Sequence, residues 1–113
     1  MLSKEQKKEA IHKFKERKSP LGVFAVRCAP TGRVWVGTSR NLNAARNGIW
    51  FSLRIDGHRD RALQDEWNAQ GEHAFVYEVL ETLEDDLSPL LLPDVLKDRK
   101  QHWMRELNAP GLL

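Results

Sequence analysis

Two apolar runs joined by a short turn dominate the hydrophobic pattern of this 113-residue chain. The runs, Leu21 to Cys28 and Val34 to Gly37, are rich in β-branched and aromatic residues, which favour strands. A Pro-Thr-Gly turn at 30–32 separates them, in which Pro presets φ at the first corner and Gly supplies a positive φ. The pattern predicts a β-hairpin with one aromatic residue on each strand, Phe24 and Trp35.

The rest of the chain carries signals for four helices and a third strand. The expected elements are a Lys-rich helix over Lys4 to Lys18 capped by Ser3, a helix capped by Asn41 or Asn43, a helix over Asp60 to Asn68 ended by Gly71, a strand over Ala74 to Leu80, and a last helix from about Asp94 to Leu107. In the helix after Asn41, we expect one broad apolar face: Ala45, Ile49, Trp50, Phe51 and Leu53. Strands and helices do not alternate strictly, so the pattern predicts a small α+β domain with an antiparallel sheet.

The length suits one domain, which we expect to span residues 20–113, preceded by a basic helix over residues 1–19. No apolar run approaches the ~20 residues that a membrane span needs. The N-terminus is Lys-rich and lacks the apolar stretch of a signal peptide, so we expect a cytoplasmic protein that does not bind membranes. The only cysteine, Cys28, is expected to be a small buried residue of a strand.

Charge is divided unevenly along the chain. Residues 1–61 contain fourteen Lys or Arg and five Asp or Glu, whereas residues 62–95 contain no Lys or Arg and nine Asp or Glu. After Lys18, every cation through residue 61 is an arginine: Arg27, Arg33, Arg40, Arg46, Arg54, Arg59 and Arg61. The planar guanidinium suits phosphate, so this segment is a candidate nucleic-acid surface. The alternative is a solvated surface on which the fold balances the two signs of charge.

Several ordered features together resemble the GIY-YIG endonucleases, and among them the intron-type homing enzymes. The matching features are GVF at 22–24, WVG at 35–37, Arg40, Arg46, His58, Leu63-Gln64, Trp67-Asn68, Gly71, Phe75, Leu80-Glu81, Trp103 and Leu107-Asn108. They extend from Leu21 to about Asn108. The resemblance implies a three-stranded antiparallel sheet flanked by helices, with the N-terminal helix as an addition to it.

The resemblance also implies hydrolysis of DNA phosphodiester bonds with one divalent metal ion, Mg²⁺ or Mn²⁺. In the family, two motif tyrosines act on the attacking water, an arginine stabilises charge on the phosphate, and a glutamate on the last helix holds the metal. Here Phe24 and Trp35 occupy the tyrosine positions and Lys100 the glutamate position. Ala45 occupies the usual arginine position, one residue before Arg46.

Candidate site residues follow from the resemblance and from the cations. The catalytic candidates are Arg40, Arg46 and His58. The candidates for nucleic-acid contact are Arg33, Arg40, Arg46, Arg54, Lys97 and Lys100. No metal ligands are predicted, since the four histidines lack the spacing of a metal site. The only tyrosine, Tyr77, is expected to be an ordinary residue of the third strand.

Three functions remain open from the sequence. The residues favour a nuclease-fold domain that binds DNA or RNA and has lost metal-dependent hydrolysis. The first alternative is an active, divergent DNA endonuclease that uses Mg²⁺ or Mn²⁺. The second is a protein-interaction module without nucleic acid, in which the two signs of charge mediate docking.

Overall fold

The computed structural model describes residues 20–83 and 88–113 and confirms the predicted α+β class. Its elements are β1 (Leu21–Cys28), β2 (Val34–Ser39), α2 (Leu42–Arg54), α3 (Arg61–Gln70), the short 3₁₀ helix η1 (Glu72–Ala74), β3 (Phe75–Leu83) and α4 (Leu92–Leu107). The helix predicted over Lys4 to Lys18 and the domain boundary at residue 19 lie outside the described residues. No helix in the described part of the chain is long and apolar enough to cross a membrane.

The three strands form one antiparallel sheet, as predicted, and their order in it is β2-β1-β3. The turn between β1 and β2 forms as the sequence indicates: Gly32 has φ of 76°, and its N–H donates to the Cys28 carbonyl at 2.8 Å. Because β1 is central, its Phe24 lies opposite Gly37 on one side and Val79 on the other.

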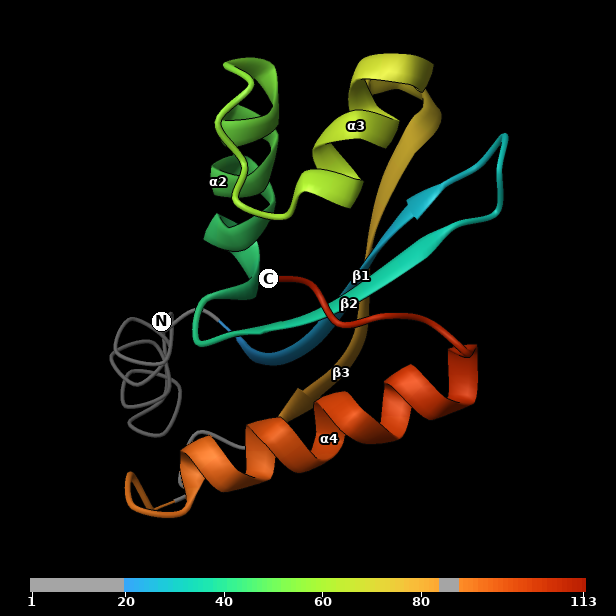
Figure 1. Ribbon diagram of the computed structural model, residues 1–113. Coiled ribbons are helices and arrows are strands. Elements are labelled where there is room, and N and C mark those ends of the chain that lie inside the picture. Colours follow the sequence, from blue (N-terminus) through green and yellow to red (C-terminus); the bar gives the residue numbers. More distant parts are fainter. Residues whose placement is uncertain (1–19, 84–87) are drawn as a thin grey trace, which may run out of the picture.

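Helices cover both faces of the sheet (Figure 1). On one face, α2 and α3 enclose the main core: Phe24, Val26, Cys28, Trp35, Leu42, Trp50, Leu53, Leu63, Trp67 and Phe75. On the other face, α4 packs against β1 and β2 through the buried Leu92 and Leu96. Glu81 of β3 fastens α4, since it accepts hydrogen bonds from Trp103 Nε1 at 2.8 Å and Arg99 Nε at 2.9 Å.

Side-chain caps fix where α2 and α3 begin. The Asn41 side chain accepts from the Ala44 N–H at 2.9 Å, which selects Asn41 over Asn43 as the cap. Asp60 accepts from the Leu63 N–H at 3.2 Å and begins α3. Gly71 ends this helix with φ of 89°, as predicted.

Two elements are displaced from their predicted limits. The third strand runs from Phe75 to Leu83, because η1 takes up Ala74. Helix α4 begins at Leu92, so that Pro93 lies in its first turn. Proline is tolerated there because N–H groups of the first turn have no partner within the helix.

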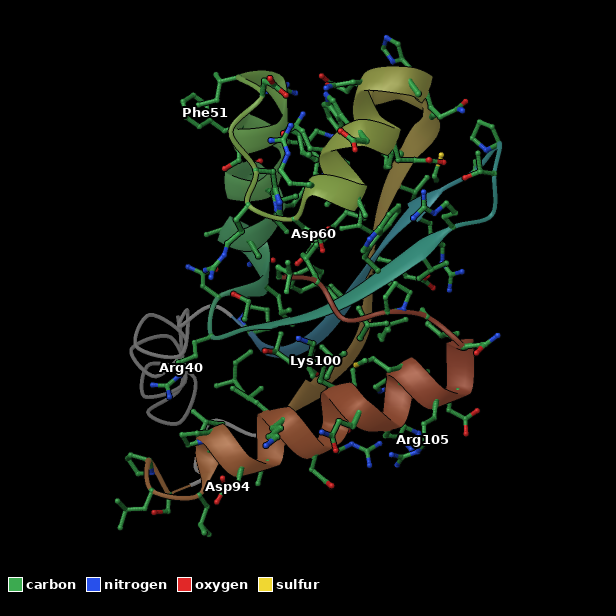
Figure 2. The ribbon with its side chains drawn as sticks, viewed as in Figure 1. Arg40, Phe51, Asp60, Asp94, Lys100 and Arg105 are labelled. Atoms are coloured by element: carbon green, nitrogen blue, oxygen red, sulfur yellow. The ribbon has the colours of Figure 1, made fainter. Side chains whose placement is uncertain are left out.

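The expected burial of Phe51 is wrong: its side chain is 61% exposed, and Figure 2 shows it pointing away from the domain. On a helix, one residue is a rotation of ~100°, which takes Phe51 off the face that buries Trp50. Cys28, in contrast, is fully buried as predicted.

The segment 109–113 follows α4 and closes the outer edge of β2. The Val36 N–H donates to the Pro110 carbonyl at 3.0 Å, and the Leu112 N–H donates to the Val36 carbonyl at 2.7 Å. Val36 and Gly111 form a parallel bridge. This edge strand therefore gains a short partner, and the segment is held next to α2 and the N-terminus of α3.

Candidate functional site

A cavity of about 300 Å³ lies where β1 and β2 meet α2 and the segment 109–113. Its lining consists of Phe24, Thr38, Ser39, Ala45, Gly48, Ile49, Ser52, His58, Leu112 and Leu113. The cavity thus brings together the first motif position, the family arginine position and His58. A larger hollow of about 450 Å³ lies between the end of α4 and Pro110, and its lining contains none of the candidate site residues.

The two aromatic residues of the hairpin motif are buried. The Phe24 ring stacks on Tyr77 with 5.1 Å between centroids, and only 3% of the residue is exposed at the cavity. Trp35 is 1% exposed and does not line the cavity. The Arg33 guanidinium lies 4.8 Å from the Trp35 ring centroid. Neither motif position therefore offers a hydroxyl group.

Ala45 and Arg46 are consecutive residues of α2, but their side chains point in different directions. Ala45 lines the cavity with Ile49 and Ser52, which follow it by four and seven residues on the same face. Arg46 instead extends over the Trp50 ring, with 5.1 Å between the guanidinium carbon and the centroid. At position 45, which the sequence resemblance aligns with the family arginine, the side chain is thus only a methyl group.

His58 carries the one titratable side chain of the cavity lining, and its hydrogen bonds determine which ring nitrogen holds the proton. Its Nδ1 accepts the Asp60 N–H at 3.0 Å, and its own N–H donates to Gln64 Oε1 at 3.0 Å. Because Nδ1 is an acceptor, the proton of the neutral ring is on Nε2. Burial lowers the pKa of His58 below its ordinary value of 6.5, so the neutral ring prevails at pH 7. His58 can therefore donate through Nε2, while the nitrogen that could take up a proton is occupied.

Tyr77 has a structural role, as the sequence predicted. Its hydroxyl donates to the Leu42 carbonyl at 2.8 Å, which ties β3 to the start of α2. Burial raises the pKa of Tyr77 to about 12. The phenol is not available as a base at neutral pH.

Lys100 points from α4 toward the segment 109–113 (Figure 2), where its Nζ donates to the Leu112 carbonyl at 3.3 Å. Gly111 permits this approach, since a Cβ there would be 2.9 Å from Lys100 Cε. The ammonium group therefore holds the chain segment that forms one wall of the cavity.

These residues do not fit a divalent metal ion. The cavity lining contains no carboxylate side chain, and Lys100, which the sequence resemblance aligns with the family glutamate, presents an ammonium group. The two carboxylate oxygens of Asp60, which follows His58 by two residues, accept from the N–H groups of Leu63 and Leu113. Within residues 20–83 and 88–113, no three His, Cys, Asp or Glu side chains form a metal-binding cluster.

Folding neutralises part of the arginine-rich segment with glutamates from the acidic segment. The pairs are Arg27 with Glu78, Arg33 with Glu66, and Arg54 with Glu72, the last two at 3.0 and 2.6 Å. Arg61 lies 3.9 Å from Asp56. Arg40, Arg46 and Arg59 have no acidic partner within 4.0 Å among the described residues.

The predicted nucleic-acid contacts do not form one surface. Arg40 directly follows the cavity-lining residue Ser39, and Arg59, which was not among the predicted contacts, directly follows His58. Lys97 is exposed on α4, on the other side of the sheet, and Lys100 is partly buried on the same helix. Arg33 and Arg54 are in ion pairs.

Comparison with known proteins identifies the fold. No protein-family model and no curated protein sequence matches the chain. Among solved structures, the catalytic domain of the homing endonuclease I-TevI superposes with a TM-score of 0.70 and 21% identity over 82% of this chain and 98% of that domain. A point mutant of the catalytic domain of the intron endonuclease I-TevI gives the same TM-score and identity over 83% of this chain and 92% of that one.

The chain has the GIY-YIG fold. At 21% identity, the likeness to these structures concerns the fold and not the chemistry.

Sequence reasoning missed the polar part of the cavity. Thr38, Ser39 and Ser52 carry its hydroxyl groups, and Leu112 and Leu113 close one side. The helical spacing of Ala45, Ile49 and Ser52 could have indicated one shared face. No sequence signal could have placed the segment 109–113 beside β2.

Proposed function

We propose that this chain is a GIY-YIG-fold domain that binds DNA or RNA and does not catalyse metal-dependent phosphodiester hydrolysis. The observation that carries the proposal is the composition of the cavity at the motif positions, where Phe24 and Ala45 present only carbon. Sites for metal-assisted hydrolysis need a group that takes a proton from water and a carboxylate that holds the ion.

Each of these requirements is unmet by the side chains present. Phe24 has no ionisable group, and Trp35 is enclosed in the core. His58 keeps its acceptor nitrogen on the Asp60 N–H. Lys100 at the glutamate position would repel a divalent cation and is engaged with Leu112. A catalytic role for Arg40 or Arg46 would therefore lack both a base and a metal ion.

Binding is supported by the cations that have no acidic partner among the described residues. Arg40 and Arg59 belong to loops at the cavity, and Arg46 lies in the second turn of α2. A guanidinium group without a carboxylate partner retains its hydrogen-bond donors for phosphate oxygens. The homing-endonuclease fold gives DNA as the first substrate to test.

The experiment measures binding and cleavage on the same protein. A fluorescent DNA duplex is titrated at several salt concentrations, and supercoiled plasmid is incubated with Mg²⁺ or Mn²⁺ at low salt. We expect affinity that falls steeply with salt, because phosphate contacts release counterions, and no nicking. Nicking that copurifies with the wild-type chain and disappears in Arg40→Ala/Arg46→Ala would establish the active endonuclease instead.

A matched pair of variants tests the arginines. Arg40→Ala/Arg59→Ala removes two guanidinium groups that have no acidic partner within residues 20–83 and 88–113, whereas Arg27→Ala/Arg54→Ala removes two that are in ion pairs. We expect the first variant to lower the salt slope by about 2 and the second to leave it nearly unchanged. The absence of salt-dependent binding by the wild type to duplex or single strands would favour the protein-interaction module.

A further inference from the structure

We propose that the cavity between α2, the β1–β2 hairpin and the segment 109–113 receives one unpaired nucleobase of a single strand. Arg40 and Arg59 would contact the phosphates on either side of that base. This inference rests on the proposed nucleic-acid binding and names the part of the nucleic acid that the cavity recognises.

The lining favours an uncharged, planar group over a phosphate. No side chain that lines the cavity is charged at pH 7, since His58 is neutral there. Phe24, Ile49 and Leu112 supply apolar surface, and Thr38, Ser39 and Ser52 supply hydroxyl groups. A phosphate would lose its hydration without gaining an opposite charge, whereas a nucleobase has apolar faces and hydrogen-bonding edges.

The fixed polar groups present donors to the ligand. Ser39 Oγ accepts the Asn41 N–H at 2.9 Å, which leaves its hydroxyl hydrogen free to donate. His58 Nδ1 accepts the Asp60 N–H, which leaves the Nε2 hydrogen free to donate. Two donors match the carbonyl oxygens of thymine or uracil.

The size of the cavity and its surroundings agree with this ligand. A volume of about 300 Å³ is at the lower limit of the ~300–1,000 Å³ typical of small-molecule sites. The two arginines follow the donor residues directly in sequence, so neutral groups line the interior and cations belong to the loops beside it. Neutral side chains in the cavity and cations beside it suit an extended strand whose base enters the cavity while the phosphates on either side of that base contact the arginines.

The test compares two fluorescent single strands of equal length, oligothymidylate and an abasic strand with the same phosphates. We expect the wild type to bind oligothymidylate about tenfold more tightly, because only that strand can fill the cavity. Ser52→Leu places a larger side chain in the cavity and should reduce this ratio to about one. Asn47→Leu adds the same side chain at an exposed position of α2 outside the cavity and should preserve the ratio.

The outcomes separate this inference from the proposed function. Equal, salt-dependent binding of both strands by the wild type would overturn the base site and leave nucleic-acid binding intact. Absence of binding to either strand or to the duplex would overturn both. If circular dichroism shows that Ser52→Leu does not fold, Ala45→Val fills the same cavity with a smaller change. A ratio that Ala45→Val or a folded Ser52→Leu leaves at the wild-type value would also refute the base site.

Discussion

The Phe24 ring lies against Gly37 so closely that a Cβ at Gly37 would be 2.5 Å from Phe24 Cζ. The two residues face each other across β1 and β2, and the ring continues onto Tyr77 of β3. The glycine of the second motif is therefore required by the packing of the aromatic residue in the first.

Gly37→Ala should lower the free energy of unfolding by about 1–3 kcal/mol, because the added methyl group overpacks the core beside Phe24. Gly48→Ala is the matched control, since a Cβ at Gly48 meets nothing within 4 Å in the interior of α2. It should stabilise the protein by about 0.5–1 kcal/mol through lower backbone entropy in the unfolded chain. Urea unfolding measures both, and equal stabilities would contradict the packing argument.

Tyr77 should make the stability depend on pH in the alkaline range. Its pKa is about 12 when folded and about 10 when unfolded, so the folded state favours the protonated phenol. The resulting stabilisation is complete below pH 10 and is lost as the pH rises toward 12. Because the chain contains one tyrosine, phenolate absorbance reports on this residue directly. Tyr77→Phe should remove the pH dependence and cost about 1 kcal/mol for the lost hydrogen bond to Leu42.

His58 should make the protein less stable in mild acid. Its folded pKa lies below the ordinary value of 6.5 because of burial, so the folded state favours the neutral ring. Stability is therefore full above pH 6.5 and falls as the pH drops through the folded pKa. His58→Asn retains an acceptor for the Asp60 N–H but does not titrate, so its urea midpoint should change less between pH 7 and 5. Parallel pH profiles for the two proteins would contradict this assignment.

Lys100→Glu restores the family residue in sequence but should not create a metal site. The lysine donates a hydrogen bond to the Leu112 carbonyl, whereas a carboxylate at position 100 would place a second acceptor beside that carbonyl. We therefore expect the free energy of unfolding to fall by about 1–3 kcal/mol. Lys100→Met removes only the hydrogen bond and should cost about 0.5–1.5 kcal/mol. Hydrogen exchange at the Leu112 amide should accelerate more in Lys100→Glu. Tight Mg²⁺ or Mn²⁺ binding by this variant in calorimetry would contradict the expectation.

Most of the fold could be predicted because its signals are local. The hairpin followed from strand formers around a Pro-Thr-Gly turn, and the start of α2 followed from Asn41 or Asn43 as its cap. The predicted helix over Asp60 to Asn68 lies where α3 forms, with Asp60 as its cap. The limits of β3 and α4 differ from the predicted ones for two reasons. A 3₁₀ turn takes up the first predicted residue of β3, and α4 accommodates a proline in its first turn. Both depend on packing and not on local sequence alone. The burial of Phe51 was predicted wrongly because consecutive residues of a helix point ~100° apart, so Phe51 does not share the buried face of Trp50.

The site could be predicted only as a set of motif positions. Sequence placed Phe24, Ala45 and His58 at positions that the fold does bring to one cavity. It could not place the segment 109–113 beside Val36 or assign partners to individual arginines, since these contacts join residues far apart in sequence. The roles of Arg40, Arg46, Lys97 and the other predicted contacts stay predictions for the binding experiments.

The strand order β2-β1-β3 has a consequence for biosynthesis. On the ribosome, the central strand β1 is made early and acquires β2 as soon as the hairpin emerges, but its other partner follows about fifty residues later. The glutamates that neutralise Arg27, Arg33 and Arg54 arrive over the same interval. A nascent chain stalled after α2 would therefore expose an open edge of β1 with an unpaired Arg27 beside ribosomal RNA, and release of β3 is the step that both covers this edge and supplies Glu78.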